Sequence, residues 1–163
     1  MPYLVDSDVF IRAKNSHYGF DLCPGFWEWV VRAHTNGVLF SVAEVRSELV
    51  QGTDELAEWV RRRPAGFFLQ PDQRTLDDLE TISRWAQTSH YDQVAVADFL
   101  DKADYFLVAQ AHCLGYTVVT HEMPDPNARK VIKIPDACRA NGVPWMSPFE
   151  MLRTEGASFV IGG

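Results

Sequence analysis

Residues 116–120, Tyr-Thr-Val-Val-Thr, decide the fold class, because they form the clearest strand in the chain. Their β-branched and aromatic side chains favour an extended backbone. A run with helical spacing precedes them over 103–114, and a second apolar run, Tyr3-Leu4-Val5, begins the chain. Both apolar runs are continuous rather than alternating, which is typical of strands buried on both faces of a parallel sheet. We therefore expect an α/β fold.

Predicted helices and strands also alternate along the rest of the chain. Further helices are predicted over 9–13, 24–36, 41–51, 54–63, 71–88, 93–100, 134–140 and from Pro148, and further extended segments over 38–40, 131–134 and 143–145. Capping boxes are predicted at Ser41 with Glu44 and at Ser147 with Glu150, a cap at Thr53, and a loop over 14–24. Strands that alternate with helices predict a mostly parallel sheet covered on both faces, in one domain over 1–163.

Composition narrows the functional classes. The chain has 163 residues and a net charge of −7, from 15 Lys and Arg against 22 Asp and Glu, which argues against nonspecific nucleic-acid binding. Its three cysteines are far apart in sequence, a pattern that fits neither a disulfide framework nor a zinc site. No apolar run reaches the ~20 residues of a membrane helix, and Asp6 comes too early for a signal peptide. A cytoplasmic protein is therefore expected.

Acidic residues follow two of the predicted strands. Asp6, with Ser7 and Asp8 behind it, ends the first strand, and Glu122 comes two residues after Thr120. Because the carboxyl ends of parallel strands lie at one edge of a sheet, where ligands bind, these residues are expected to lie together.

Two helical carboxylates, Glu48 and Asp104, can join this edge. Each acidic residue also has a structural alternative: Asp6 as a helix cap, Glu48 on a solvated face, and Asp104 in a helix's first turn. Glu44 is assigned to its capping box and excluded from the site. Carboxylates that converge would repel one another, and oxygen ligands alone favour Mg²⁺ or Mn²⁺ over zinc. Such an ion suits phosphodiester hydrolysis.

These segments resemble the acidic motifs of the PIN-domain family over residues 3 to about 145. The motifs are Tyr3-Leu4-Val5-Asp6-Ser7-Asp8, Val45-x-x-Glu48-Leu49, the run 103–111 around Asp104, and Val118-Val119-Thr120-x-Glu122. The tail from Lys130 to Cys138 is similar to an uncharacterised bacterial PIN-like subgroup.

The resemblance implies a three-layer α/β/α fold and a Mg²⁺- or Mn²⁺-dependent endoribonuclease, the VapC-like toxin of a bacterial toxin–antitoxin pair. It implies that the metal is held by Asp6, Glu48, Asp104 and Glu122. Ser7 and Thr120 would orient carboxylates or waters, with Asp8 beside them. An RNA substrate, a cognate antitoxin and a homodimer are the partners it implies.

Two alternatives stay open. Asp6-x-Asp8 after an apolar strand also resembles the first motif of haloacid-dehalogenase-type phosphatases, where the first Asp is the nucleophile and Thr120 and Lys130 would fill later positions. The paired carboxylates that such an enzyme needs near its C-terminus are absent from the sequence. A non-catalytic PIN-like RNA-binding module is the other alternative.

RNA contact requires local positive charge in a chain that is acidic overall. Arg12, Lys14 and Arg46 lie close in sequence to the acidic motifs and are the predicted RNA-binding residues. The densest basic clusters are 61–63 and 129–133, and each could instead be a solvated face. Aromatic side chains that could stack on unpaired bases are Tyr18, Phe20 and Trp27.

Overall fold

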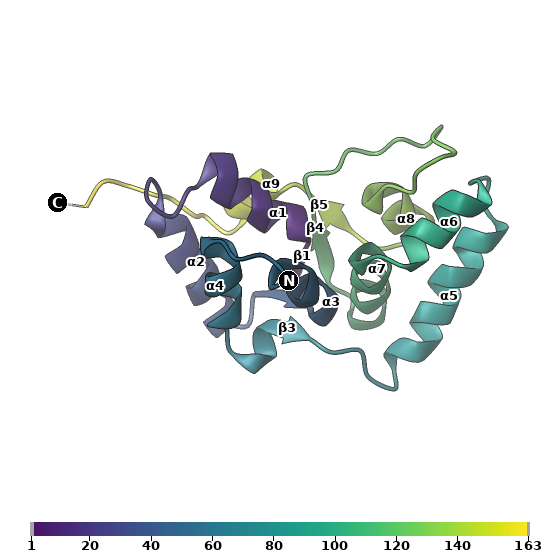
Figure 1. The fold of residues 1–163 in the computed structure, drawn as a ribbon, viewed down its shortest axis with the longest axis horizontal. Coiled ribbons are helices and arrows are strands. Elements are labelled where there is room, and N and C mark those ends of the chain that lie inside the picture. The colour runs from purple at the N-terminus through teal and green to yellow at the C-terminus, as the bar shows by residue number, and fades with distance from the viewer. Residues whose placement is uncertain (1, 163) are drawn as a thin grey trace.

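A computed structural model describes residues 2–162 and shows three layers, with a five-stranded parallel sheet between two layers of helices (Figure 1). The strands are β1 (Tyr3–Val5), β2 (Leu39–Val42), β3 (Phe68–Leu69), β4 (Thr117–Val119) and β5 (Trp145–Met146). Their order in the sheet is β3-β2-β1-β4-β5, and every pair is parallel. The predicted α/β/α fold is confirmed.

Helices cover both faces of the sheet. They are α1 (Ser7–Arg12), α2 (Pro24–Thr35), α3 (Ala43–Leu49), α4 (Glu55–Arg61), α5 (Thr75–Thr88), α6 (Gln93–Leu100), α7 (Ala103–Leu114), α8 (Ile134–Ala140) and α9 (Pro148–Thr154). Figure 1 shows α1, α2, α4 and α9 on one side and α5 to α8 on the other. Among residues 2–162, no helix is long and apolar enough to cross a membrane.

The central strands β1 and β4 position the site. All residues of both strands are buried, as their continuous apolar sequence requires. Val5 pairs with Val119, so the residues that follow the two strands emerge side by side. The chain runs outward from β1 to β2 and β3 and then returns to β4, which makes the β1–β4 boundary a topological switch point. In open α/β sheets ligands bind at such a boundary, outside the carboxyl ends of the strands.

Four local predictions are wrong. Residues 131–133 form no strand, since Ile134 begins α8. Residues 14–17, predicted as loop, belong to a π-helical turn, Ala13–His17, that continues α1. Ser41 lies in β2 and donates its hydroxyl to Val5 O at 2.6 Å rather than capping α3. The cap of α4 is Asp54, whose Oδ1 accepts from Ala57 N at 3.0 Å, in place of Thr53.

At the other predicted capping box the Ser147 cap is confirmed, because Ser147 Oγ accepts from Glu150 N at 3.1 Å. Three helices, 93–100, 103–114 and 134–140, have the predicted bounds. Gly115 ends the second of them at φ 71°, a left-handed backbone that glycine adopts without a side-chain clash.

Candidate functional site

Asp6 lies at the centre of the switch point and is only 4% exposed. Its backbone N–H donates to Val119 O at 2.9 Å, which carries the sheet pairing one residue past β1. Its Oδ2 accepts the Thr120 hydroxyl at 2.9 Å. Asp6 stands at the N-cap of α1, but its side chain makes no capping hydrogen bond. The capping alternative for Asp6 is therefore excluded, and the carboxylate faces the end of β4.

Ser7 connects the first strand to α3. Its hydroxyl lies 3.5 Å from Asp6 Oδ1 and 3.4 Å from Glu48 Oε1, so it can donate to either carboxylate. Glu48 is otherwise exposed on α3. The structure thus brings the motif Val45-x-x-Glu48-Leu49 to the same edge as Asp6.

The segment after β4 adds Glu122 and contacts Asp8 of α1. His121 N donates to Asp8 Oδ1 at 3.4 Å, and Glu122 N donates to Thr120 Oγ1 at 3.1 Å. Glu122 Oε2 accepts from Ile134 N, at the start of α8, at 3.2 Å. One oxygen of Glu122 is therefore held by a helix N-terminus, where a negative charge is favourable.

Asp104 reaches the site from the first turn of α7. It lines a cavity of about 380 Å³ together with Glu44, Glu48 and Lys102. We define the carboxylate cluster as Asp6, Asp8, Glu48, Asp104 and Glu122. All four predicted metal ligands and Asp8 belong to it.

Burial and neighbouring charges raise the pKa values of three carboxyl groups in the cluster. Burial, followed by the charges of Asp8 and Asp104, raises the pKa of Asp6 well above its ordinary value. Burial and the charges of Glu122, Glu48 and Asp8 raise the pKa of Asp104 to about 7, against a smaller lowering effect of Lys102. Burial also raises the pKa of Glu122. The carboxylates interact strongly enough that full ionisation of all of them is costly.

The donor atoms of the cluster suit a hard cation. They are carboxylate and hydroxyl oxygens, the ligand type that Mg²⁺ and Mn²⁺ prefer, and a cation would remove the mutual repulsion. Within residues 2–162 no three His, Cys, Asp or Glu side chains converge on one point as metal ligands. The cluster thus supplies oxygen donors and negative charge, but its side chains do not close on a common centre.

Glu44 is a site residue that sequence reasoning missed. With Ser41 in β2, Glu44 loses the capping role assigned to it, and its Oε2 is buried without a hydrogen-bond partner. Burial raises the pKa of Glu44, which lines the same cavity as Asp104. The sequence did contain a signal for this position: Glu44 precedes Glu48 by four residues, and that spacing places both carboxylates on one side of α3.

The predicted RNA-binding residues differ in their surroundings. Arg12 and Arg46 are exposed, whereas Lys14 Nζ pairs with Asp54 at 3.1 Å. Two further cations interact with the cluster: Lys102, which the sequence did not single out, interacts with Asp104 and Glu122, and Lys133, from the basic cluster 129–133, interacts with Glu122. These two lysines provide local positive charge beside the carboxylates.

Two arginines of the basic cluster 61–63 make contacts within the fold. Arg61 donates to Glu58 at 2.7 Å and to Val50 O at 2.8 Å. Arg63 lies 4.4 Å from the centre of the Trp59 ring and donates to Trp59 O. These contacts favour the structural alternative for Arg61 and Arg63.

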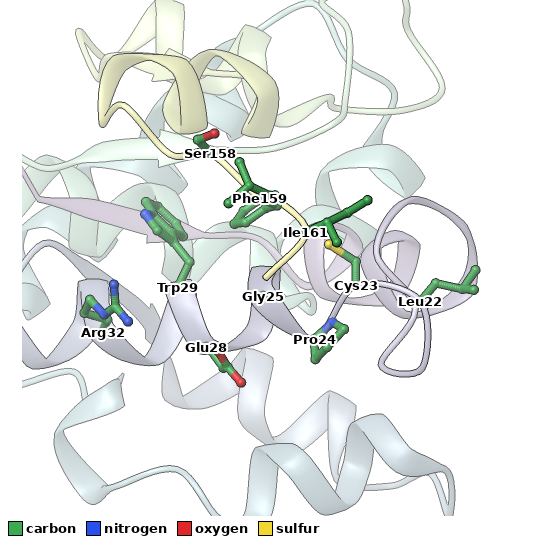
Figure 2. Close-up of a pocket in the computed structure, with 11 residues that line it drawn as sticks. Leu22, Cys23, Pro24, Gly25, Glu28, Trp29, Arg32, Ser158, Phe159 and Ile161 are labelled. Carbon is green, nitrogen blue, oxygen red and sulfur yellow. The ribbon is translucent and has the colours of Figure 1, made fainter. Parts of the chain in front are cut away.

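Another cavity lies away from the carboxylates. It measures about 460 Å³ and lies between α2 and the C-terminal segment, with Trp29 and Phe159 on its walls (Figure 2). Glu28 and Arg32 are its charged lining residues, and no member of the carboxylate cluster lines it. The two features therefore belong to separate regions of the molecule.

The fold and the cluster define the chain as a three-layer α/β/α protein with carboxylates gathered at its switch point. The chain belongs to the family described as Domain of unknown function (DUF4411), which matches residues 3–159. No curated protein and no solved structure matches the chain.

The raised pKa of Asp104 predicts how metal-free stability depends on pH. A carboxyl that titrates at 3.8 when unfolded and at about 7 when folded binds its proton more tightly in the folded state. Its contribution to the free energy of unfolding is complete below pH 3.8 and is lost as pH rises through about 7. Each pKa unit corresponds to about 1.4 kcal/mol, so the loss amounts to several kcal/mol.

Urea unfolding in EDTA at pH 4 to 8 measures this contribution, with Asp104→Asn as the comparison because its amide does not titrate. The stability of Asp104→Asn relative to wild type is expected to increase across this range. A difference that is constant with pH would contradict the assigned environment of Asp104.

Proposed function

We propose that the chain is a Mg²⁺- or Mn²⁺-dependent endoribonuclease that hydrolyses RNA phosphodiester bonds. The observation that carries the proposal is the buried Asp6 carboxylate at the switch point, hydrogen-bonded to Thr120 and flanked by like charges. A buried acidic group that only stabilised the fold would pair with a cation. Asp6 instead faces other carboxylates, the arrangement expected of a cation site.

Each residue has a role in this proposal. Asp6, Glu48, Asp104 and Glu122 would hold the ion, which when bound activates a water and neutralises charge on the phosphate. Thr120 fixes the orientation of Asp6, and Ser7 does the same between Asp6 and Glu48. Lys102, held 2.7 Å from Asp98, offers a positive charge at the edge of the cavity for the RNA backbone.

The position of Glu48 favours this proposal over a phosphatase. A haloacid-dehalogenase-type mechanism needs Asp6 as nucleophile and Asp8 as general acid, and it gives Glu48 no role. Here Glu48 shares the Ser7 hydroxyl with Asp6 and contributes to the raised pKa of Asp104. Three acidic motifs far apart in sequence therefore interact through Glu48.

A pair of substitutions separates the two mechanisms. Glu48→Gln is expected to lower RNA cleavage at least ~10-fold, since it removes a charged ligand. Asp8→Asn is expected to retain a measurable fraction of the RNA cleavage activity, because the amide oxygen can still accept a hydrogen bond from His121 N. Loss of a general acid would instead cost ~100-fold or more.

Initial cleavage rates on labelled RNA and hydrolysis rates on an aryl phosphate measure the two activities. Glu80→Gln, which changes an exposed carboxylate on α5, is the matched control. Phosphatase turnover that is abolished by Asp8→Asn and unaffected by Glu48→Gln would replace the nuclease proposal with the phosphatase.

The toxin role, the antitoxin partner and a homodimer remain predictions from the PIN resemblance, and the cytoplasmic location remains a prediction from the sequence. A non-catalytic RNA-binding module is the outcome if RNA binds and no metal supports cleavage.

A further inference from the structure

A cavity of about 240 Å³ opens beside α8. Its lining residues come from the end of α5, from the segment that leads to α6, and from α8, elements that lie on the same side of the sheet in Figure 1. No member of the carboxylate cluster lines it. We define it as the α8 cavity. Pockets that hold drug-sized molecules measure ~300–1,000 Å³, so the α8 cavity suits a smaller ligand.

Asp136 provides a buried negative charge in the α8 cavity. The residue is only 8% exposed, and its Oδ2 accepts a hydrogen bond from Asp125 N at 2.8 Å. Among residues 2–162 no hydrogen bond reaches its other oxygen, Oδ1. Burying a charged group is costly unless hydrogen bonds or an opposite charge compensate for it. Asp136 therefore retains an acceptor oxygen that a ligand could use.

The hydroxyl of Tyr91 is a second polar group of this cavity. Tyr91 is also 8% exposed, and burial, followed by the charges of Asp136 and Asp125, raises its pKa. In the part of the chain that the structure describes, its hydroxyl has no hydrogen-bond partner. The hydroxyl oxygen can therefore accept a hydrogen bond from a ligand that binds beside Asp136.

Arg139 adds a positive charge that Asp136 does not neutralise. The two residues lie three positions apart in α8, a spacing that places both side chains on one side of a helix. Both line the cavity, yet neither forms an ion pair within residues 2–162. Arg139 is exposed, whereas Asp136 is buried. The cavity therefore presents a negative charge inside and a positive charge at its rim.

Three aromatic rings form the apolar wall of the cavity. The Tyr91 ring lies 4.2 Å from the His90 ring and 6.0 Å from the Trp85 ring, between ring centres. The His90 ring nitrogen Nε2 is hydrogen-bonded to Ala128 O at 2.9 Å. Contacts within the protein thus hold this wall in place, which lowers the entropic cost of ordering it around a ligand.

We propose that the α8 cavity binds a free α-amino acid with an apolar side chain. The ammonium group would donate to Asp136 and Tyr91, and the carboxylate would accept from Arg139. The apolar side chain would pack against the aromatic wall. A ligand with only a negative charge would be repelled by Asp136, and one with only a positive charge would be repelled by Arg139. The site does not rest on the proposed nuclease function, because it involves neither the carboxylate cluster nor a metal.

Isothermal titration calorimetry on the full chain in EDTA, without RNA, tests this site. The probe is L-leucine, and its matched single-charge analogues are isopentylamine, which lacks the carboxylate, and isocaproate, which lacks the ammonium group. We expect saturable binding of L-leucine at millimolar concentration. Each analogue should bind at least ~10-fold more weakly, since each loses one hydrogen bond between charged groups.

Two substitutions locate the binding. Arg139→Gln changes an exposed side chain and should weaken L-leucine binding at least ~10-fold without weakening isopentylamine binding. Asp136→Asn keeps an oxygen that can accept from Asp125 N, and it should weaken the binding of both compounds. Arg153→Gln, which changes an exposed arginine on α9, is the matched control and should bind L-leucine as wild type does.

Three results would overturn the inference. The first is that wild type does not bind L-leucine. The second is binding that Arg139→Gln leaves unchanged, which decides the matter even if Asp136→Asn does not fold. The third is isopentylamine that binds as tightly as L-leucine, because the site would then recognise amines alone. None of these results alters the nuclease proposal, which RNA cleavage tests in a separate assay.

Discussion

Asp6→Asn is expected to reduce metal-dependent RNA cleavage at least ~100-fold, the cost of removing one positioned electrostatic group from an active site. The amide keeps the shape of the side chain and can still accept the Thr120 hydroxyl. It loses the negative charge that would hold the ion. Because Asp6 is buried among like charges, the change should leave the metal-free fold intact or stabilise it.

Initial cleavage rates in Mg²⁺ and thermal melts in EDTA, each compared with wild type, separate loss of activity from loss of folding. Glu80→Gln controls for the removal of an exposed carboxylate. Wild-type rates from a well-folded Asp6→Asn protein would contradict the assignment of Asp6 as a ligand.

Divalent metal is expected to stabilise the folded protein by about 2.7 kcal/mol when its concentration exceeds its dissociation constant a hundredfold. The gain arises because the ion binds carboxylates that are held together only in the folded state. These carboxylates repel one another without it, as the raised pKa values of Asp6 and Asp104 indicate.

Urea unfolding with Mg²⁺, with Mn²⁺ and with EDTA measures this gain, and Ca²⁺ and Na⁺ at matched ionic strength test its specificity. The double variant Asp6→Asn/Asp104→Asn should be more stable than wild type in EDTA and should gain little from either metal. An equal stabilisation of wild type and double variant would show that the ion acts elsewhere.

The sequence predicts the sheet edge because strand ends are local features. The apolar runs that end at Asp6 and Thr120 can be recognised as strands from the sequence alone, because strands buried on both faces have continuous apolar sequences. Their adjacency in the sheet required the structure, because strand order depends on how the chain returns from β3 to β4.

Predictions failed where two local explanations competed. Ser41 followed by Glu44 has the pattern of a capping box, but β2 extends through Ser41 to Val42, so the hydroxyl bonds to Val5 O across the sheet. This misassignment removed Glu44 from the predicted site. The contact between the His17 and Phe149 rings escaped prediction for a different reason: the two residues are far apart in sequence, and only the fold brings them together.

The most direct test of the account is incubation of the purified protein with total RNA in Mg²⁺, in Mn²⁺ and in EDTA, with Asp6→Asn in parallel. The account predicts cleavage products with either metal, none in EDTA, and restoration when metal is added back in excess of the chelator. Asp6→Asn should give almost none under any condition. RNA cleaved equally well in EDTA, or equally well by Asp6→Asn, would contradict the assignment of the carboxylate cluster as a metal-dependent nuclease site.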